Sequence, residues 1–241
     1  MRIIHMSDIH IVKDGAKIWN TDTKAHFDKA LNKIRQLNDI DAIFVSGDLS
    51  DDGSLWAYQY LDESFKSLGI PTYCCPGNHD DISVMINSEI PTFYKKDEYV
   101  SIHGWDFYFL NTAVEGMAKG KLSDEKLQFI EGSLNQSLNP VGFIIHHPPI
   151  EPEGWLNRKL LENRNDFNLL INKYSKVKFV LFGHIHYHMI QVINNIIYSS
   201  ASSIGFAFDV KLPKFQIADG TEGFNLISLS NKQVFIENIF I

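Results

Sequence analysis

The sequence predicts an αββα sandwich, a four-layer fold that combines α/β and α+β character. Two mixed β-sheets would pack face to face, with helices on the outside. Strand patterns alternate with helical patterns up to about residue 184, and the remainder is strand-like and rich in turns. Alternation of this kind indicates βαβ units, and each sheet then needs a layer to cover its apolar face. The 241 residues, 44% of them hydrophobic, predict a single domain over 1–241.

Helical spacing of apolar residues recurs in four segments. In the first, Phe27, Leu31 and Ile34 fall on one face. In the third, Ser123 precedes two acidic residues, which suits a helix N-terminus. The four predicted helices cover 24–38, 54–68, 123–134 and 166–174.

Strand patterns occur outside the helical segments as well. Residues 98–111 read as a hairpin around Gly104, and their aromatic residues are expected in the core. Asn194-Asn195 is a plausible hairpin turn, and 224–229 with 233–240 are expected to form a final strand pair.

Five apolar runs each stop directly before residue types that bind metals. The runs cover 2–6, 42–46, 72–76, 142–145 and 178–182. Ligands of open α/β sheets bind beyond the carboxyl ends of the strands, so the side chains after these runs are expected to converge. They supply seven oxygen and nitrogen donors: Asp8, His10, Asp48, Asn78, His146, His184 and His186.

Seven donors exceed what one mononuclear catalytic ion uses, so two ions that share a ligand are predicted. Carboxylate and imidazole ligands without thiolates suit Mn, Fe or Zn and disfavour a structural zinc site. A carboxylate is the natural bridge, and two ions about 3.5–4 Å apart can clamp a phosphoryl displacement.

The local spacing is expected to present these donors. Asp8-x-His10 and His184-x-His186 would each point one way from an extended strand end, and the glycines directly before ligands would permit a sharp turn. His146 and His147 face opposite sides of a strand, so one of them is the ligand. We expect His146 to fill that role.

The five blocks together resemble the calcineurin-like metallophosphoesterase superfamily. They stand in the family's order and span residues 8 to 186, most of the chain. The segments 47–53 and 120–125 are most similar to its class III 3',5'-cyclic-nucleotide phosphodiesterase branch. The blocks are Asp8-x-His10, Gly47-Asp48, Gly77-Asn78-His79-Asp80, His146-His147-Pro148-Pro149 and Gly183-His184-x-His186.

The resemblance implies two divalent metal ions and a role for each donor. Asp8, His10 and His186 would hold the first ion, with Asn78, His146 and His184 on the second, and Asp48 would bridge them. A metal-activated hydroxide would attack the phosphorus. His79 would contact the phosphate and protonate the leaving oxygen, while Asp80 orients the His79 ring as a second catalytic residue.

The expected activity is hydrolysis of a small soluble phosphodiester, with a cyclic nucleotide as the first candidate. Glycerophosphodiesters, nucleotide pyrophosphates and phosphomonoesters are alternatives. Ile82 and Asn111 depart from the branch, where Arg and Asp are common, and leave the substrate open. Segments 11–22, 148–162 and 201–221 are expected to shape the pocket. The candidate substrate contacts are His79, Asn111, His147, Trp155, His188 and Phe206.

Two other classes of function compete with the hydrolase. One is an interaction module on the same fold without catalysis, but such modules usually have gaps in the ligand set, and this set is complete. The other is a mononuclear iron oxygenase, which would leave four donors unexplained.

Net charge and cysteine content limit the partners and the cellular compartment that the sequence suggests. The net charge of −7 disfavours nucleic acid, whether duplex or single-stranded, as a partner. The adjacent Cys74 and Cys75 build no disulfide framework. A strand is expected from residue 2, so we expect no signal peptide. Polar residues interrupt the uncharged stretch 179–208. We therefore expect a cytoplasmic protein without a membrane span. The hydrophobic region 187–208 could support a homodimer or form a buried sheet.

Overall fold

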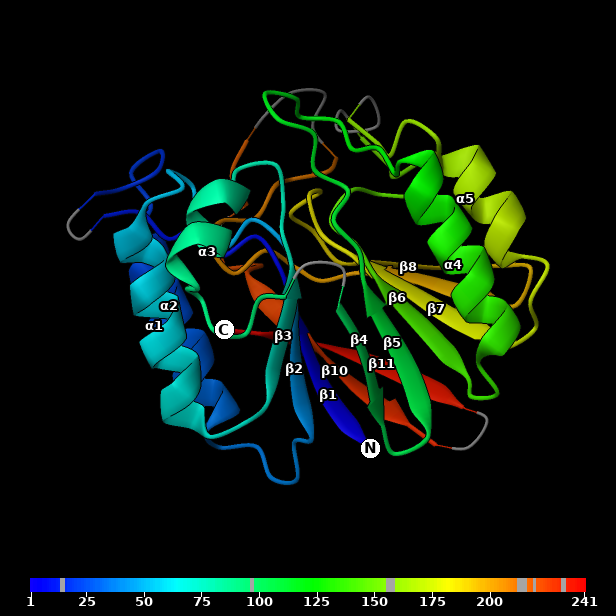
Figure 1. The fold of residues 1–241 in the computed structure, drawn as a ribbon. Helices are drawn as coiled ribbons and strands as arrows, with labels where there is room; N and C mark the ends of the chain where they lie inside the picture. The colour runs from blue at the N-terminus through cyan, green and yellow to red at the C-terminus, as the bar shows by residue number, and fades with distance from the viewer. Residues whose placement is uncertain (14–15, 96–97, 155–158, 212–215, 219, 231–232) are drawn as a thin grey trace.

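The computed structural model describes residues 1–13, 16–95, 98–154, 159–211, 216–218, 220–230 and 233–241. Two mixed β-sheets lie face to face between two groups of helices (Figure 1), which confirms the predicted sandwich.

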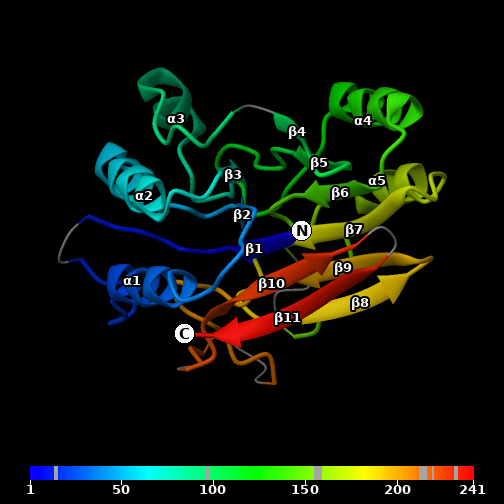
Figure 2. The same cartoon turned by 90° about the horizontal axis from the view of Figure 1, so that it is seen from below.

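The first sheet has five strands among the described residues, in the order β11-β10-β1-β2-β3. The strands β1 to β3 are parallel, and β10 pairs antiparallel with β1 and with β11. Their bounds are β1 Arg2–Met6, β2 Ala42–Ser46, β3 Thr72–Cys75, β10 Gly223–Leu229 and β11 Val234–Phe240. Figure 2 shows β10 and β11 returning beside β1 at the end of the chain.

The second sheet has six strands within the described ranges, in the order β4-β5-β6-β7-β9-β8. Its central strands β5, β6, β7 and β9 are parallel. The bounds are β4 Glu98–Ile102, β5 Trp105–Phe109, β6 Val141–Ile144, β7 Val177–Phe182, β8 Met189–Ile193 and β9 Ile196–Ser200.

The helices cover the outer faces of the two sheets (Figure 1). On the side of the first sheet lie α1 Thr23–Ile34, α2 Leu55–Leu68 and α3 Ile82–Ser88. On the side of the second lie α4 Asp124–Gln136 and α5 Arg164–Ile171. The predicted caps form: the Ser123 hydroxyl accepts from the Lys126 N–H at 3.2 Å, which satisfies an otherwise free N–H at the start of α4.

Buried apolar residues form three separate clusters, one at each contact between layers. Phe27 and Leu61 belong to the cluster under α1 and α2, and Ile130 and Phe167 to the cluster under α4 and α5. Between the sheets, Phe44 packs against Phe107 with ring centroids 4.9 Å apart. Successive apolar side chains of each central strand therefore point to opposite faces of the sheet. A sheet that is covered on both sides needs apolar residues on both faces.

The predicted elements agree with the structure apart from a few boundaries and one helix that was not predicted. The hairpins β4–β5 and β8–β9 and the strand pair β10–β11 are confirmed. Asn194 and Asn195 form the β8–β9 turn with φ of 50° and 66°, the left-handed geometry of a two-residue hairpin turn. The first helix ends at Ile34 rather than 38, and α3 was not predicted because seven residues carry too little periodicity.

None of the helices in the described part of the chain is both long enough and apolar enough to span a bilayer. Cys74 and Cys75 are buried and form no disulfide within the described residues.

Candidate metal centre

Two clusters of buried donors meet where strands of both sheets end. Asp8 and His10 follow β1, Asp48 follows β2, and His186 follows β7. One ligand atom of each of these four residues lies within 4.8 Å of the others. All four residues are buried, with 0–5% of their surface exposed. Residues 178 positions apart in the sequence are thus brought into one pocket.

The first cluster presents only atoms that can accept hydrogen bonds. His186 Nε2 lies 3.3 Å from Asp8 Oδ1 and 3.2 Å from His10 Nε2. Asp48 Oδ2 lies 3.6 Å from His10 Nε2.

The second cluster shares an oxygen atom with the first. His146 Nε2 lies 3.3 Å from the same Asp48 Oδ2 and 3.2 Å from Asn78 Oδ1. His184 Nδ1 lies 3.2 Å from His146 Nε2. One carboxylate oxygen therefore faces both clusters, and this is the arrangement a bridging ligand needs.

Hydrogen bonds on the far side of three rings fix which nitrogen faces the centre. The Nδ1 atoms of His146 and His186 lie 2.8 Å and 2.7 Å from the carbonyl oxygens of Ser46 and Phe206. A carbonyl can only accept, so both Nδ1 atoms carry hydrogen. His10 Nδ1 likewise donates to Asp51 Oδ1 at 2.9 Å. In its neutral form each ring then turns an Nε2 lone pair inward, the orientation typical of metal-binding histidines.

Lone pairs that face one another at 3.2 Å repel unless a positive charge lies between them. The donor set therefore fits bound cations, and its mixture of carboxylate, amide and imidazole suits Mn, Fe or Zn.

The pKa values of the buried groups point to the same demand for positive charge. Burial lowers the pKa of His146, but the carboxylates of Asp48 and Asp8 outweigh it and raise the pKa to about 9. Burial and the neighbouring His146 hold the pKa of His184 well below its ordinary value. Binding a cation would replace the His146 proton, so it would release protons.

The backbone of the centre differs from the extended strand ends expected from the sequence. Five of the seven predicted donors have φ in the left-handed region, between 50° and 73°: Asp8, His10, Asp48, His184 and His186. Such backbone costs on the order of 1–3 kcal/mol at a non-glycine residue. It persists here because the Asp8 and His10 N–H groups donate to the carbonyls of Gly47 and Asp48, each at 3.0 Å.

Gly47 has a φ of 92°, as a sharp turn requires, but Gly77 and Gly183 act differently from the expectation. A Cβ on Gly77 would lie 2.1 Å from Asp48 Oδ1, and one on Gly183 would lie 1.8 Å from Ser7 Oγ. Neither has a positive φ. These glycines are required by close approach of neighbouring loops rather than by a turn.

His79 lies at the mouth of the centre, where the solvent reaches it. Its side chain is 43% exposed, and its Nδ1 lies 3.3 Å from Asp51 Oδ1. Its backbone N–H donates to Asp48 Oδ1 at 2.9 Å. The Asp51 carboxylate is the largest cause that raises the pKa of His79 to about 9, with Asp48 adding to it.

The structure corrects the expected role of Asp80. Its carboxylate accepts from the N–H groups of Leu49, Ser50 and Gly77 and from the Tyr58 hydroxyl at 3.2 Å. It therefore holds the loop after Asp48 in place, and Asp51 is the carboxylate beside the His79 ring. No role for Asp51 was predicted from the sequence, although it follows Asp48 by three positions on the same loop.

Two other predicted substrate contacts, Phe206 and His188, have partners within the protein. Phe206 is 2% exposed and packs against the rings of His10 and His186, with centroids 4.9 Å and 4.6 Å away. His188 Nδ1 lies 3.1 Å from the Ser200 carbonyl, outside both donor clusters.

The remaining candidates have local partners or fall outside the described ranges. Asn111 Oδ1 accepts from the Ala113 N–H at 2.8 Å. His147 is buried beside the second cluster, with its Nδ1 2.8 Å from Thr112 Oγ1. Trp155 lies outside the described residues.

Loading with Mn²⁺ is expected to raise the melting temperature of the protein. One site filled at about 100 times its Kd adds about 2.7 kcal/mol to the free energy of unfolding. For a chain of this size that corresponds to roughly 5–11 °C. Differential scanning calorimetry with EDTA and with graded Mn²⁺ measures the shift. A melting temperature independent of Mn²⁺, or an equal shift in His186→Ala, would contradict a metal site here.

Comparison with known proteins gives one family match and several close relatives. The model described as "Calcineurin-like phosphoesterase" matches residues 1–188. A "3',5'-cyclic-nucleotide phosphodiesterase" of Nostoc sp. is 30% identical over 94% of this chain and 87% of its own length. A "Probable glycerophosphodiester phosphodiesterase" of Arcobacter nitrofigilis is 30% identical over 84% of this chain and 78% of its own.

A solved structure, a dimetal phosphatase from Danio rerio, has a similar fold. The TM-score is 0.73 at 11% identity, over 98% of this chain and 95% of that one.

Proposed function

Since this chain belongs to the calcineurin-like phosphoesterase family, we propose that it is a dinuclear metal-dependent phosphodiesterase for small phosphodiesters. The observation that carries the proposal is Asp48 Oδ2, which lies 3.6 Å from His10 Nε2 and 3.3 Å from His146 Nε2. One oxygen between two donor clusters suits two cations better than one. Two such ions supply Lewis-acid polarisation of the phosphoryl oxygens and a water nucleophile at neutral pH.

Residues around the metal ions would fix the orientation of the ligand rings and limit access to the ions. The Ser46 and Phe206 carbonyls and the Asp51 carboxylate hold three imidazole rings in one tautomer. Outer partners of this kind fix ring orientation and raise ligand basicity. All four rings are nearly inaccessible, with at most 7% of each residue exposed, so only the open side of the centre admits a phosphodiester.

His79 would deliver a proton to the leaving oxygen. It is the exposed imidazole at the mouth, and its raised pKa keeps it protonated at neutral pH. Asp51 holds the Nδ1 side of the ring, so Nε2 is the nitrogen that can turn toward a bound phosphate. A positioned general acid typically contributes about 10²–10⁴-fold to the rate.

A cyclic nucleotide is our first choice of substrate, and a glycerophosphodiester is the alternative. The relatives carry both names. An aromatic side chain near the mouth favours the nucleotide: Trp19 is 58% exposed and meets Phe206 edge-on, with ring centroids 5.0 Å apart. Phe206 in turn contacts His10 and His186, so Trp19 stands one ring away from the first cluster.

Replacing Trp19 with Ala is expected to weaken hydrolysis of a cyclic nucleotide selectively. Stacking of a base on an aromatic ring contributes about 1–3 kcal/mol, so kcat/KM for cyclic AMP should fall roughly 5–150-fold. The kcat/KM for glycerophosphoethanolamine, which has no base, should stay the same. Trp19→Phe is the matched control. Equal losses of kcat/KM on both substrates would show that Trp19 does not recognise the base.

The activity itself is tested on the purified, Mn²⁺-loaded chain. Cyclic AMP, glycerophosphoethanolamine and a phosphomonoester are compared under the same conditions. Turnover of a phosphodiester that disappears with EDTA and returns with Mn²⁺ supports the proposal. Turnover of the monoester alone would replace it with a phosphatase activity.

A further inference from the structure

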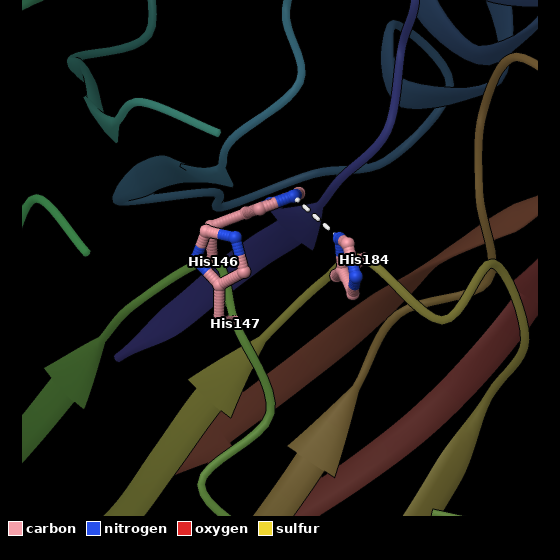
Figure 3. Close-up of side chains that lie close together, drawn as sticks. All are labelled: His146, His147 and His184. Carbon is pink, nitrogen blue, oxygen red and sulfur yellow. Dashed lines mark hydrogen bonds between the residues drawn. The ribbon is translucent and has the colours of Figure 1, made fainter. Parts of the chain in front are cut away.

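His184 differs from the other three imidazoles of the centre. It turns Nδ1, rather than Nε2, toward the second cluster, 3.2 Å from His146 Nε2 (Figure 3). Its Nε2 is buried and has no hydrogen-bond partner. The other three rings each have an oxygen acceptor on the far side.

This orientation leaves a buried donor to be satisfied. If the Nδ1 lone pair of His184 faces a cation, Nε2 must carry the hydrogen. A buried N–H without an acceptor costs on the order of 1–3 kcal/mol. A metal-binding histidine almost always donates its second N–H, so an acceptor is expected beside it.

The neighbouring His147 has the complementary unpaired atom. Its Nε2 is also buried without a partner, and the His147 and His184 ring centroids are 5.0 Å apart. One ring nitrogen from each of His146, His147 and His184 lies within 4.8 Å of the others. The rings of His147 and His184, each with a buried unpaired Nε2, therefore lie side by side.

Thr112 can set the tautomer that makes His147 an acceptor. Its Oγ1 lies 2.8 Å from His147 Nδ1, and a hydroxyl can accept from a ring N–H. With the hydrogen on Nδ1, the Nε2 of His147 keeps a lone pair.

The backbone of Gly120 lies against the His147 ring. A Cβ on Gly120 would lie 2.4 Å from that ring. The Gly120 N–H donates to the Leu160 carbonyl at 3.2 Å, and its carbonyl accepts from the Glu162 N–H at 2.8 Å. The ring of His147 is thus clamped between a fixed loop and Thr112, as a positioning residue should be.

We propose that His147 is a positioning residue for the second metal ion. It accepts the Nε2–H of His184 through one trapped water, and thereby holds His184 in the orientation in which Nδ1 can bind that ion. The proposal rests on the two-ion centre proposed above. It assigns to His147 a contact with a ligand rather than with the substrate.

The test replaces the acceptor and measures metal binding to the whole chain. His147→Phe keeps a flat ring without an acceptor, and His147→Gln restores an acceptor oxygen. Titration calorimetry with Mn²⁺ should show two sites in the wild type. In His147→Phe the Kd of the weaker site should rise about 10–100-fold, with the tighter site unchanged and partial recovery in His147→Gln. Electron paramagnetic resonance should report loss of Mn–Mn coupling in the same variant.

A second pair of variants and a stability control keep the test decisive. Thr112→Val removes the hydroxyl and should weaken the same site, whereas Thr112→Ser should not. Leu134→Ala, in the core under α4, lowers stability without touching the centre and should bind both ions normally. Two unchanged sites in both His147→Phe and Thr112→Val would overturn the proposal. If His147→Phe does not fold, the threonine pair decides. A wild type that binds no second ion would overturn the two-ion function instead.

Discussion

Asp48→Asn is expected to leave at most one tightly bound metal ion and to lower phosphodiesterase kcat by at least about 10³-fold. The carboxylate oxygen that faces both clusters becomes part of a neutral amide. A bound metal contributes several kcal/mol of transition-state stabilisation, and roughly 4 kcal/mol corresponds to about a thousandfold change in rate. Metal content by mass spectrometry and turnover of cyclic AMP measure the two effects separately.

Asp52→Asn is the matched control, because it makes the same chemical change four positions away. Asp52 is exposed, and its carboxylate accepts from Ser50 Oγ and the Ser54 N–H, each at 3.0 Å. It should keep both ions and nearly full activity. Full turnover in Asp48→Asn would rule out a bridging role for Asp48 and with it the dinuclear mechanism.

His79→Ala is expected to lower kcat for cyclic AMP by about 10²–10⁴-fold, the usual range for a general acid, while both ions stay bound. A ribose hydroxyl is a poor leaving group and needs a proton, whereas p-nitrophenolate does not. The loss should therefore be much smaller on bis(p-nitrophenyl) phosphate. Steady-state kinetics on both substrates, together with metal content, measure the effect.

The pH profile gives an independent check on the same residue. Asp51 and Asp48 raise the pKa of His79 to about 9, so the protonated form is lost only as the pH rises through that value. Bound cations favour the neutral ring and offset part of this rise, so activity on cyclic AMP should fall at or below about pH 9. Asp51→Asn removes the largest cause of the raised pKa, so the fall in activity should begin at lower pH. Two results would argue against the general-acid role. One is an equal loss of kcat on both substrates in His79→Ala, and the other is a high-pH fall in activity that Asp51→Asn does not shift.

The general architecture could be predicted from the sequence because periodicity carries it. The strand-helix alternation, the aromatic strand β5 and the Asn194-Asn195 turn each have a local signature. The sequence also predicted that the donors lie close together, since parallel strands end at one edge of a sheet. That three of these strands belong to one sheet and two to the other depends on how the sheets pack, which no local pattern encodes.

The details of the centre depend on tertiary contacts and were partly mispredicted. Left-handed φ at Asp8 or His184 is unfavourable for the isolated residue and is imposed by hydrogen bonds to other loops. Phe206 was read as a substrate contact because it follows a ligand-bearing strand, but its ring is buried and its carbonyl holds His186. The role of Asp51 could have been found from its spacing to Asp48, had both been placed on one loop.

The segment after β9 returns to the metal centre. The chain must therefore extend beyond its last metal ligand for the centre to assemble. All seven donors lie before residue 188, yet the Ser203 hydroxyl and the Gly205 N–H both donate to the Asp8 carbonyl, at 2.8 Å and 2.9 Å. The Phe206 carbonyl holds His186, and β10 covers the open side of β1. A fragment that stops at 188 would contain every ligand and still expose β1 as an unpaired edge. Truncated versions of this protein should therefore retain residues through β11 if they are to bind metal.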